Sequence, residues 1–259
     1  MLKKLFPLFA YFKYWLKKED SYSLQSPFVF NIYQGLKDYI KLTDSSFQEI
    51  EVYRRKLLDS DKEIEVLDLG AGSKKVNFKK RKVADITKFS TSSKKFGLLY
   101  QYFCQLTPAR TVLELGTCMG ITTRYLSQKT QGILFTFEGS LEIQNLAKVS
   151  SGYSNTQYVL GDISNTLPEI LSKIETVDFA LLDANHTYTG TIEYFELILE
   201  KVSEKSIIAI GDIHWSKEME KAWHQIKNNL KVKLSMDFYE CGIVFFDSTH
   251  QKSEYILDI

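Results

Sequence analysis

Residues 111–125, with the sequence TVLELGTCMGITTRY, constrain the fold more than any other segment of this chain. Residues 112–115 form an apolar run that predicts a buried strand, and apolar residues at helical spacing resume from residue 121 to 127. Gly116 and Gly120 separate the two elements. A glycine turn at this place lets a ligand approach bare backbone beside the N-terminus of a helix.

A second apolar run, residues 133–137, ends in Glu138, which stands 22 residues after Gly116. Nucleotide-binding α/β folds hold ribose hydroxyls with an acidic residue at about this distance from the glycine turn. The strand, the turn, the helix and the acid therefore predict a site for a nucleoside-type ligand.

The spacing of the glycines narrows the choice of ligand. A dinucleotide fingerprint needs G-x-G-x-x-G, whereas this turn reads Gly-Thr-Cys-Met-Gly, with the bulky Met119 in the loop. The sequence has no G-x-x-x-x-G-K-[ST] phosphate loop. The pattern E-L-G-x-x-x-G resembles motif I of class I S-adenosylmethionine-dependent methyltransferases. Residues 95–125 resemble most the catechol O-methyltransferase group of small-molecule O-methyltransferases, and the resemblance continues through residues 158–163, 178–183 and 207–212.

Downstream of Glu138 the predicted elements alternate, as a doubly wound sheet requires. Strands are predicted at residues 157–160, 177–182 and 206–210, helices at 167–174, 191–202 and 219–230, and a closing hairpin at 231–239 and 242–246. We predict an α/β, Rossmann-like, doubly wound, seven-stranded and mostly parallel sheet with a C-terminal antiparallel hairpin. A helical cap with a Lys-rich loop (1–94) is expected to precede the methyltransferase domain (95–259), which the resemblance covers.

Four acidic residues, Glu138, Asp162, Asp183 and Asp212, each follow a predicted strand. Doubly wound sheets bind ligands outside the carboxyl ends of their strands, so these acids mark the predicted site.

The resemblance implies S-adenosylmethionine as the cofactor. We expect Glu138 to hold the ribose and Thr122, in the first helical turn, to bind the carboxylate of the methionine tail. Asp162 either binds the adenine amine or caps the turn after Gly161, and the sequence leaves both open. Glu114 lies mid-strand among apolar residues and must be paired, so we expect it to support the glycine loop. The predicted cofactor-binding set is Glu114, Gly116, Thr117, Cys118, Gly120, Thr122, Glu138, Gly139, Asp162, Ile163 and Asp183.

The segment 183–188, Asp-Ala-Asn-His-Thr-Tyr, carries the predicted catalytic groups. Methyl transfer to a hydroxyl needs a positioned acceptor and removal of its proton, and histidine is suited to take a proton near neutral pH. The resemblance places a metal ligand at Asp183 and a lysine base at the position of His186. We predict that His186 and Asp183 are catalytic, the alternative being that His186 is a loop residue bonded to backbone. His214 and Trp215 are predicted to wall the acceptor pocket.

The metal site of the related enzymes is incomplete in this sequence. Magnesium-dependent members follow the second strand-end aspartate with Asn, whereas Ile213 follows Asp212 here and cannot coordinate a cation. We predict that no metal is required. Asp183 and Asp212 remain a candidate cation site, which His186 or His214 would join for a softer ion.

Residues 64–73, IEVLDLGAGS, contain a second glycine motif with Asp68, Gly70 and Gly72. Six basic residues follow it instead of a buried strand ending in an acid, so we predict that it is not the cofactor loop. The Lys-rich stretch is expected to be a solvated loop, with a flap over the active site as the alternative.

Residues 1–18 are basic and amphipathic. After Pro7, the apolar residues Leu8, Phe9, Phe12, Trp15 and Leu16 share one helical face. Interrupting lysines and the lack of a cleavage site argue against a signal peptide. We favour packing of this face on its own domain or on a second subunit, and contact with an anionic membrane surface is the alternative.

Composition excludes several classes of protein. The chain has 259 residues, of which 44% are hydrophobic, enough for a full core, and its net charge of +1 does not indicate a nucleic-acid partner. Three cysteines without metal-like spacing and the lack of an 18-residue apolar run predict a cytoplasmic protein. We expect a small-molecule acceptor. A homodimer, or peripheral contact with the inner membrane face through the N-terminal helix, stays open.

Two other functions share parts of this pattern. An NAD-linked oxidoreductase would have the same first strand, turn and ribose acid, but Met119 and the missing third glycine disfavour it. A non-catalytic nucleoside-binding module would keep the glycine turn and lose a usable base, which the Asp183–His186 pair argues against.

Overall fold

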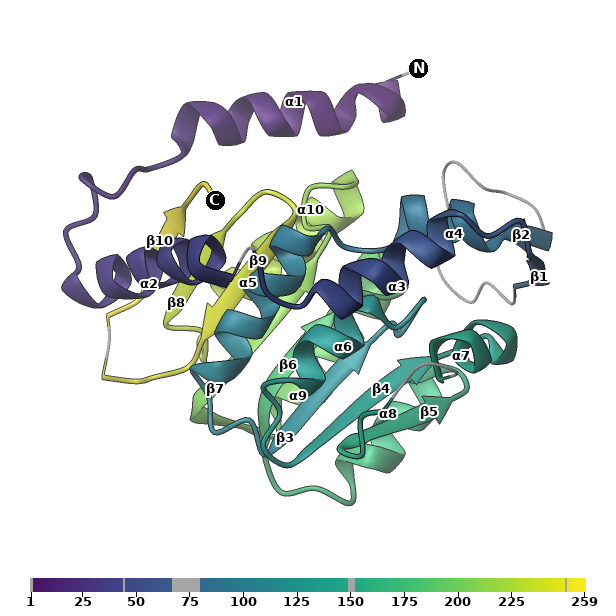
Figure 1. Cartoon of the computed structure of the whole chain (residues 1–259). Helices are drawn as coiled ribbons and strands as arrows, with labels where there is room; N and C mark the ends of the chain where they lie inside the picture. The colour runs from purple at the N-terminus through teal and green to yellow at the C-terminus, as the bar shows by residue number, and fades with distance from the viewer. Residues whose placement is uncertain (1, 44, 67–79, 149–151, 250) are drawn as a thin grey trace.

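The computed structural model describes residues 2–43, 45–66, 80–148, 152–249 and 251–259. One eight-stranded sheet forms its centre, in the order β10-β8-β9-β7-β6-β3-β4-β5 (Figure 1). The strands are β3 (Thr111–Leu115), β4 (Ile133–Glu138), β5 (Thr156–Leu160), β6 (Val177–Leu182), β7 (Val202–Gly211), β8 (Leu234–Asp237), β9 (Cys241–Phe245) and β10 (Ser253–Ile256). All neighbouring strands are parallel except β9, which is antiparallel to both β7 and β8. The predicted doubly wound sheet with its closing hairpin is confirmed.

The sheet has one strand more than predicted. β10 pairs in parallel with β8 at the edge, with Ser253 opposite Leu234. Its sequence, Ser-Glu-Tyr-Ile, is short and partly exposed, so it lacks the apolar run that signals a buried strand. Its pairing with β8 comes from the tertiary structure.

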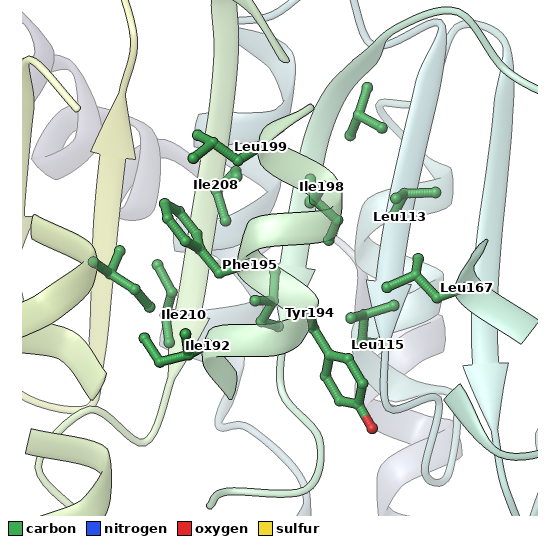
Figure 2. Close-up of a cluster of buried hydrophobic side chains, with 14 of the residues drawn as sticks. Leu113, Leu115, Leu167, Ile192, Tyr194, Phe195, Ile198, Leu199, Ile208 and Ile210 are labelled. Atoms are coloured by element: carbon green, nitrogen blue, oxygen red, sulfur yellow. The ribbon is translucent and has the colours of Figure 1, made fainter. Parts of the chain in front are cut away.

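Helices cover both faces of the sheet. On one face lie α8 (Ile163–Leu171), α9 (Tyr188–Leu199) and α10 (Lys217–Asn228), and their apolar residues form one buried cluster with the strands. Figure 2 shows α9 in this cluster, with Phe195 and Ile198 beside Ile208 and Leu113. On the other face, α5 (Lys94–Gln105) packs through residues such as Phe103. Because the central strand β6 is covered on both faces, all six of its residues are buried.

The N-terminal third adds helices α1 (Leu2–Lys17), α2 (Pro27–Thr43), α3 (Gln48–Leu58) and α4 (Val83–Ser90), and a small antiparallel pair, β1 (Glu63–Glu65) with β2 (Lys80–Lys82). Leu36 of α2 lies in the same buried cluster as α5. α3 contacts α6 (Ile121–Ser127), since the Tyr125 hydroxyl donates to Glu51 Oε1 at 2.8 Å. The remaining helix is α7 (Leu141–Lys148).

The predicted domain boundary at residue 94 stays a prediction. The second glycine motif, with Asp68, Gly70 and Gly72, and most of the Lys-rich stretch lie outside the described residues.

α1 packs on the body through a different face from the one predicted. Ala10 and Tyr14 are buried, and the Tyr14 hydroxyl donates to the carbonyl oxygen of Leu257 at 2.7 Å. The predicted apolar face is 53–66% exposed over its five residues Leu8, Phe9, Phe12, Trp15 and Leu16. The expectation that this face packs on its own domain is therefore wrong. The sequence periodicity correctly groups these five residues on one face of α1. The contact with the body is made instead by the opposite face, which contains Tyr14 and was not considered in the sequence analysis. Among the described residues, no helix combines the length and apolarity needed to cross a membrane.

Candidate active site

Parallel pairing brings the predicted acids to one edge of the sheet. Glu138 is the last residue of β4, while Asp183 and Asp212 directly follow β6 and β7. The strand ends are also joined by the backbone, since the N–H of Asp183 donates to the carbonyl oxygen of Leu115 at 2.9 Å. The N–H of Gly161, after β5, donates to the carbonyl oxygen of Glu138 at 3.0 Å. The site predicted from the sequence is thus assembled from four strands.

The glycine turn is held in a left-handed conformation that its sequence permits. The φ angles of Gly116, Cys118 and Gly120 are 106°, 47° and 67°. A Cβ at Gly116 would lie 2.5 Å from the carbonyl oxygen of Asp183, so only glycine fits between the two strand ends. At Gly120 a Cβ would lie 3.0 Å from the Cβ of Ala147 on α7. Both glycines are needed for packing within the chain, and they leave the backbone of the turn close to the strand ends.

Glu138 fixes this turn to the end of β4. Its Oε2 accepts from the N–H of Cys118 at 2.9 Å, and its Oε1 accepts from the N–H of Ser140 at 3.0 Å, across Gly139. Nucleotide-binding α/β folds hold ribose hydroxyls with an acidic residue at the end of this strand. The geometry fits a ribose diol at this position.

Glu114 lies beneath the turn and is fully buried. The hydroxyls of Thr123 and Thr136 both donate to its Oε2 at 2.6 Å, and Thr117 hydrogen-bonds to Thr136 at 2.6 Å. Its Oε1 has no hydrogen-bond partner among the described residues. Burial raises the pKa of Glu114 to about 8, against the lowering effect of the two threonine hydroxyls.

These contacts match the supporting role expected for Glu114. Sequence reasoning missed Thr123 and Thr136, although a threonine in the first turn of the helix and another mid-strand are the signal that could have found them.

Three other residues of the predicted cofactor set are turned toward the protein. Thr117 is 2% exposed, and its hydroxyl hydrogen-bonds to that of Thr136. Thr122 is 8% exposed. Ile163 is 9% exposed and belongs to the buried cluster of the α8–α10 face.

Asp162 caps helix α8. Its Oδ1 accepts from the N–H of Ser164 at 2.9 Å and from the Ser164 hydroxyl at 2.8 Å. Of the two interpretations left open by the sequence, the structure shows the cap.

Met119 corrects one step of the sequence argument. Its side chain is fully buried in a cluster with Ile121 and Tyr125, so it does not obstruct a ligand above the turn. The case against a dinucleotide therefore rests on the missing third glycine and on the antiparallel β9, and not on the bulk of Met119.

The segment after β6 carries the second half of the site. Asn185 and His186 both have positive φ, 67° and 47°, a costly conformation for residues other than glycine. His186 Nδ1 lies 3.8 Å from Asp212 Oδ2 and has no hydrogen-bond partner among the described residues. The Trp215 ring lies 6.0 Å from the imidazole, centre to centre. The loop thus aims the imidazole at the strand-end acids.

Asp183 is held in a charged and enclosed position. The pKa of Asp183 is raised to about 6, mainly by burial; His186 acts in the opposite direction, and the charge of Asp212 adds to the rise. A Cβ at Gly211 would lie 2.2 Å from Asp183 Oδ1, so the carboxyl group occupies the space that a side chain there would need. The sequence analysis did not identify Gly211 as a site residue, because nothing in the local sequence shows that the Asp183 side chain packs against it.

Tyr100 of α5 also belongs to this region. Its side chain is buried, it hydrogen-bonds to Cys241, and burial together with the charges of Asp183 and Asp212 raises its pKa. It lies 83 residues before Asp183 in the chain, and no sequence pattern links the two.

His214 and Trp215, predicted to wall the acceptor pocket, differ in placement. His214 Nε2 lies 2.9 Å from Asp237 Oδ2, which also accepts from Trp223 Nε1 at 3.1 Å. Its ring stacks on Tyr239 with centres 5.5 Å apart, and only 12% of its side chain is exposed. The His214 side chain thus contacts Asp237 and Tyr239, whereas Trp215 lies beside His186.

Asp183, His186 and Asp212 could together hold a cation, since their donor atoms all lie within 4.8 Å of one another. Ile213 is fully buried and offers no ligand. Two carboxylates and one imidazole suit Mn²⁺, Fe²⁺ or Zn²⁺ better than Mg²⁺, which favours all-oxygen sites. The absence of a metal requirement stays a prediction.

Comparison with known proteins places this geometry in a class. Residues 113–213, which hold the glycine turn and all four strand-end acids, match a family model described as a methyltransferase domain. No curated protein matches the chain in sequence.

Solved structures share the fold at low identity. The O-methyltransferase TomG from Streptomyces achromogenes, in complex with SAM, is 15% identical, with a TM-score of 0.52 over 61% of this chain and 82% of that chain. A putative caffeoyl-CoA O-methyltransferase from Staphylococcus aureus is 11% identical, with a TM-score of 0.58 over 82% and 99%. An O-methyltransferase from Bacillus cereus in complex with SAH is 19% identical, with a TM-score of 0.51 over 60% and 83%. The Rossmann-like fold predicted from the sequence is confirmed, and the methyltransferase domain matched over residues 113–213 agrees with the predicted class.

Proposed function

We propose that this chain transfers the methyl group of S-adenosylmethionine to an oxygen atom of a small-molecule acceptor. The observation that carries the proposal is the meeting of two half-sites at one sheet edge. One is the glycine turn fixed by Glu138, and the other is the Asp183–His186–Asp212 cluster. The three O-methyltransferase structures named above, two of them with SAM or SAH, support the choice of cofactor and of oxygen as acceptor.

The topology argues against an oxidoreductase. The classic dinucleotide-binding sheet has six parallel strands in the order 3-2-1-4-5-6. Here the antiparallel β9 lies between β7 and β8, as the methyltransferase resemblance implies.

The residues of the chain divide the work of the reaction. S-adenosylmethionine supplies an electrophilic methyl group on a sulfonium. The acceptor oxygen forms the new bond to carbon as the carbon–sulfur bond breaks, and the leaving thioether needs no proton. Glu138 would accept hydrogen bonds from the ribose hydroxyls, and the backbone of the glycine turn would support the methionine tail. His186 takes the acceptor's proton, and the resulting imidazolium is stabilised by the charge of Asp212 at 3.8 Å.

The test compares His186→Ala with His186→Lys, because the resemblance implies a lysine base at this position. Release of S-adenosylhomocysteine is measured with a panel of small hydroxylated acceptors, and cofactor affinity is measured by calorimetry. We expect His186→Ala to lower turnover by about 10²–10⁴-fold with little change in affinity, because proton removal acts in the transition state. His186→Lys should restore part of the loss at alkaline pH. Unchanged turnover in His186→Ala would assign the base to another group.

Treatment with a chelator distinguishes catalysis by the His186 base from catalysis that needs a bound metal ion. We expect most activity to survive chelator treatment. Complete loss, restored by a divalent cation and unaffected by His186→Ala, would instead make Asp183 and Asp212 a metal site.

A further inference from the structure

Helix α1 is attached to the body by one narrow face. Ala10 and Tyr14 are 4% and 7% exposed, and the Tyr239 hydroxyl donates to the carbonyl oxygen of Pro7 at 2.7 Å. The Tyr11 ring meets the Tyr239 ring edge-on, with centres 5.1 Å apart. Figure 1 shows α1 on the outside of the molecule, connected to α2 by an extended segment.

The opposite face of α1 is a continuous apolar surface without a partner among the described residues. Its members and their exposed fractions are Leu5 40%, Leu8 66%, Phe9 62%, Phe12 58%, Trp15 53% and Leu16 61%. At 100° per residue they cover an arc of about 120°, centred opposite the packed face. Scattered apolar residues are normal on a surface, but six on one helical face indicate a binding surface.

The charge around this face indicates the occupant. The first 18 residues contain five lysines and no acidic residue, in a chain whose net charge is only +1. The side chains of Lys13 and Lys17 are exposed on one flank of the apolar arc. A second copy of α1 would bring lysines against lysines, whereas a surface of lipid phosphates would complement them.

We propose that α1 docks on an anionic lipid bilayer, with its apolar face in the boundary between headgroups and acyl chains and with Lys13 and Lys17 at the phosphates. The packed face of α1 contacts Tyr239, whose ring stacks on that of His214. The carbonyl oxygen of the neighbouring Glu240 accepts from the N–H of Asp212. Docking therefore holds the candidate active site close to the bilayer. The proposal does not depend on the methyltransferase function, since binding is measured without cofactor.

The test is co-sedimentation of the full chain with phosphatidylcholine vesicles, prepared with and without phosphatidylglycerol. We expect binding to the anionic vesicles that weakens with salt. Lys13→Gln/Lys17→Gln should bind about thirtyfold more weakly, since each lysine at an anionic surface contributes about 1 kcal/mol, or about fivefold. Phe12→Ser/Trp15→Ser should lose at least about tenfold.

Control variants change exposed residues of the same kind outside α1. Leu230 and Tyr22 are 88% and 98% exposed, so Leu230→Ser/Tyr22→Ser removes apolar surface outside α1. Lys173→Gln/Lys205→Gln removes the same charge from exposed positions on other elements. Both controls should bind as the parent chain does, and thermal unfolding verifies that every variant is folded.

Three results would overturn the proposal. They are no binding to anionic vesicles, equal losses in the controls, and a lipid-free dimer that Phe12→Ser/Trp15→Ser dissociates. The last would assign the face to a second copy of the chain.

Discussion

Replacing Glu114 with Gln tests whether a buried carboxyl group under the glycine turn controls the pH dependence of stability. In the native state, burial raises the pKa of Glu114 from 4.5 to about 8. The native state therefore binds more protons than the unfolded state between these two values, and its stability falls as the pH rises through them. Each pKa unit corresponds to about 1.4 kcal/mol, so the accumulated loss is on the order of 5 kcal/mol above pH 8.

Gln cannot ionise, and its amide oxygen can accept from Thr123 and Thr136 as Glu114 Oε2 does. Near pH 4 both side chains are neutral, and the two proteins should have similar free energies of unfolding. The advantage of Glu114→Gln should then grow by about 1.4 kcal/mol per pH unit and level off above pH 8.

Urea unfolding at pH 4, 6, 7 and 9 measures this difference, and titrations common to both proteins cancel. A difference that stays constant across this range would refute the reasoning, because it would mean that Glu114 does not change its protonation on unfolding.

The remaining predictions concern the two half-sites. Glu138→Ala should weaken S-adenosylmethionine binding by about 1.5–3 kcal/mol in calorimetry, the range for hydrogen bonds to a charged group, whereas Asp68→Ala in the second glycine motif should leave affinity nearly intact. The reverse pattern would show that the wrong glycine loop was chosen. Gly211→Ala places a Cβ 2.2 Å from Asp183 Oδ1 and should displace that carboxyl group, lowering turnover more than cofactor affinity. Equal turnover in this variant would mean that the position of Asp183 does not matter for the reaction.

The predicted elements were recovered wherever the sequence carries a local signal. Apolar runs became β3, β4, β6 and β7, and the acids that follow them lie at one edge. These features are local, because consecutive apolar residues indicate a buried strand and glycines indicate a turn.

Contacts between segments that are distant in the chain could not be predicted from local sequence patterns. Gly211 gives space to Asp183, and Tyr100 lies near the same acids from α5. Both relations join residues far apart in the chain, and neither changes the local pattern at its own position. Met119 shows the converse, since its place in the turn suggested an obstacle although its side chain is fully buried in a cluster with Ile121 and Tyr125.

By itself the sequence determined the alternation of strands and helices, the glycine turn, the row of strand-end acids and the apolar periodicity of α1. Tertiary structure alone decided that Gly211 gives space to Asp183, that His186 faces Asp212 and that the apolar face of α1 is exposed. The physical reason is that periodicity fixes which residues share a face of an element. Only the packing of elements distant in the chain fixes what that face meets.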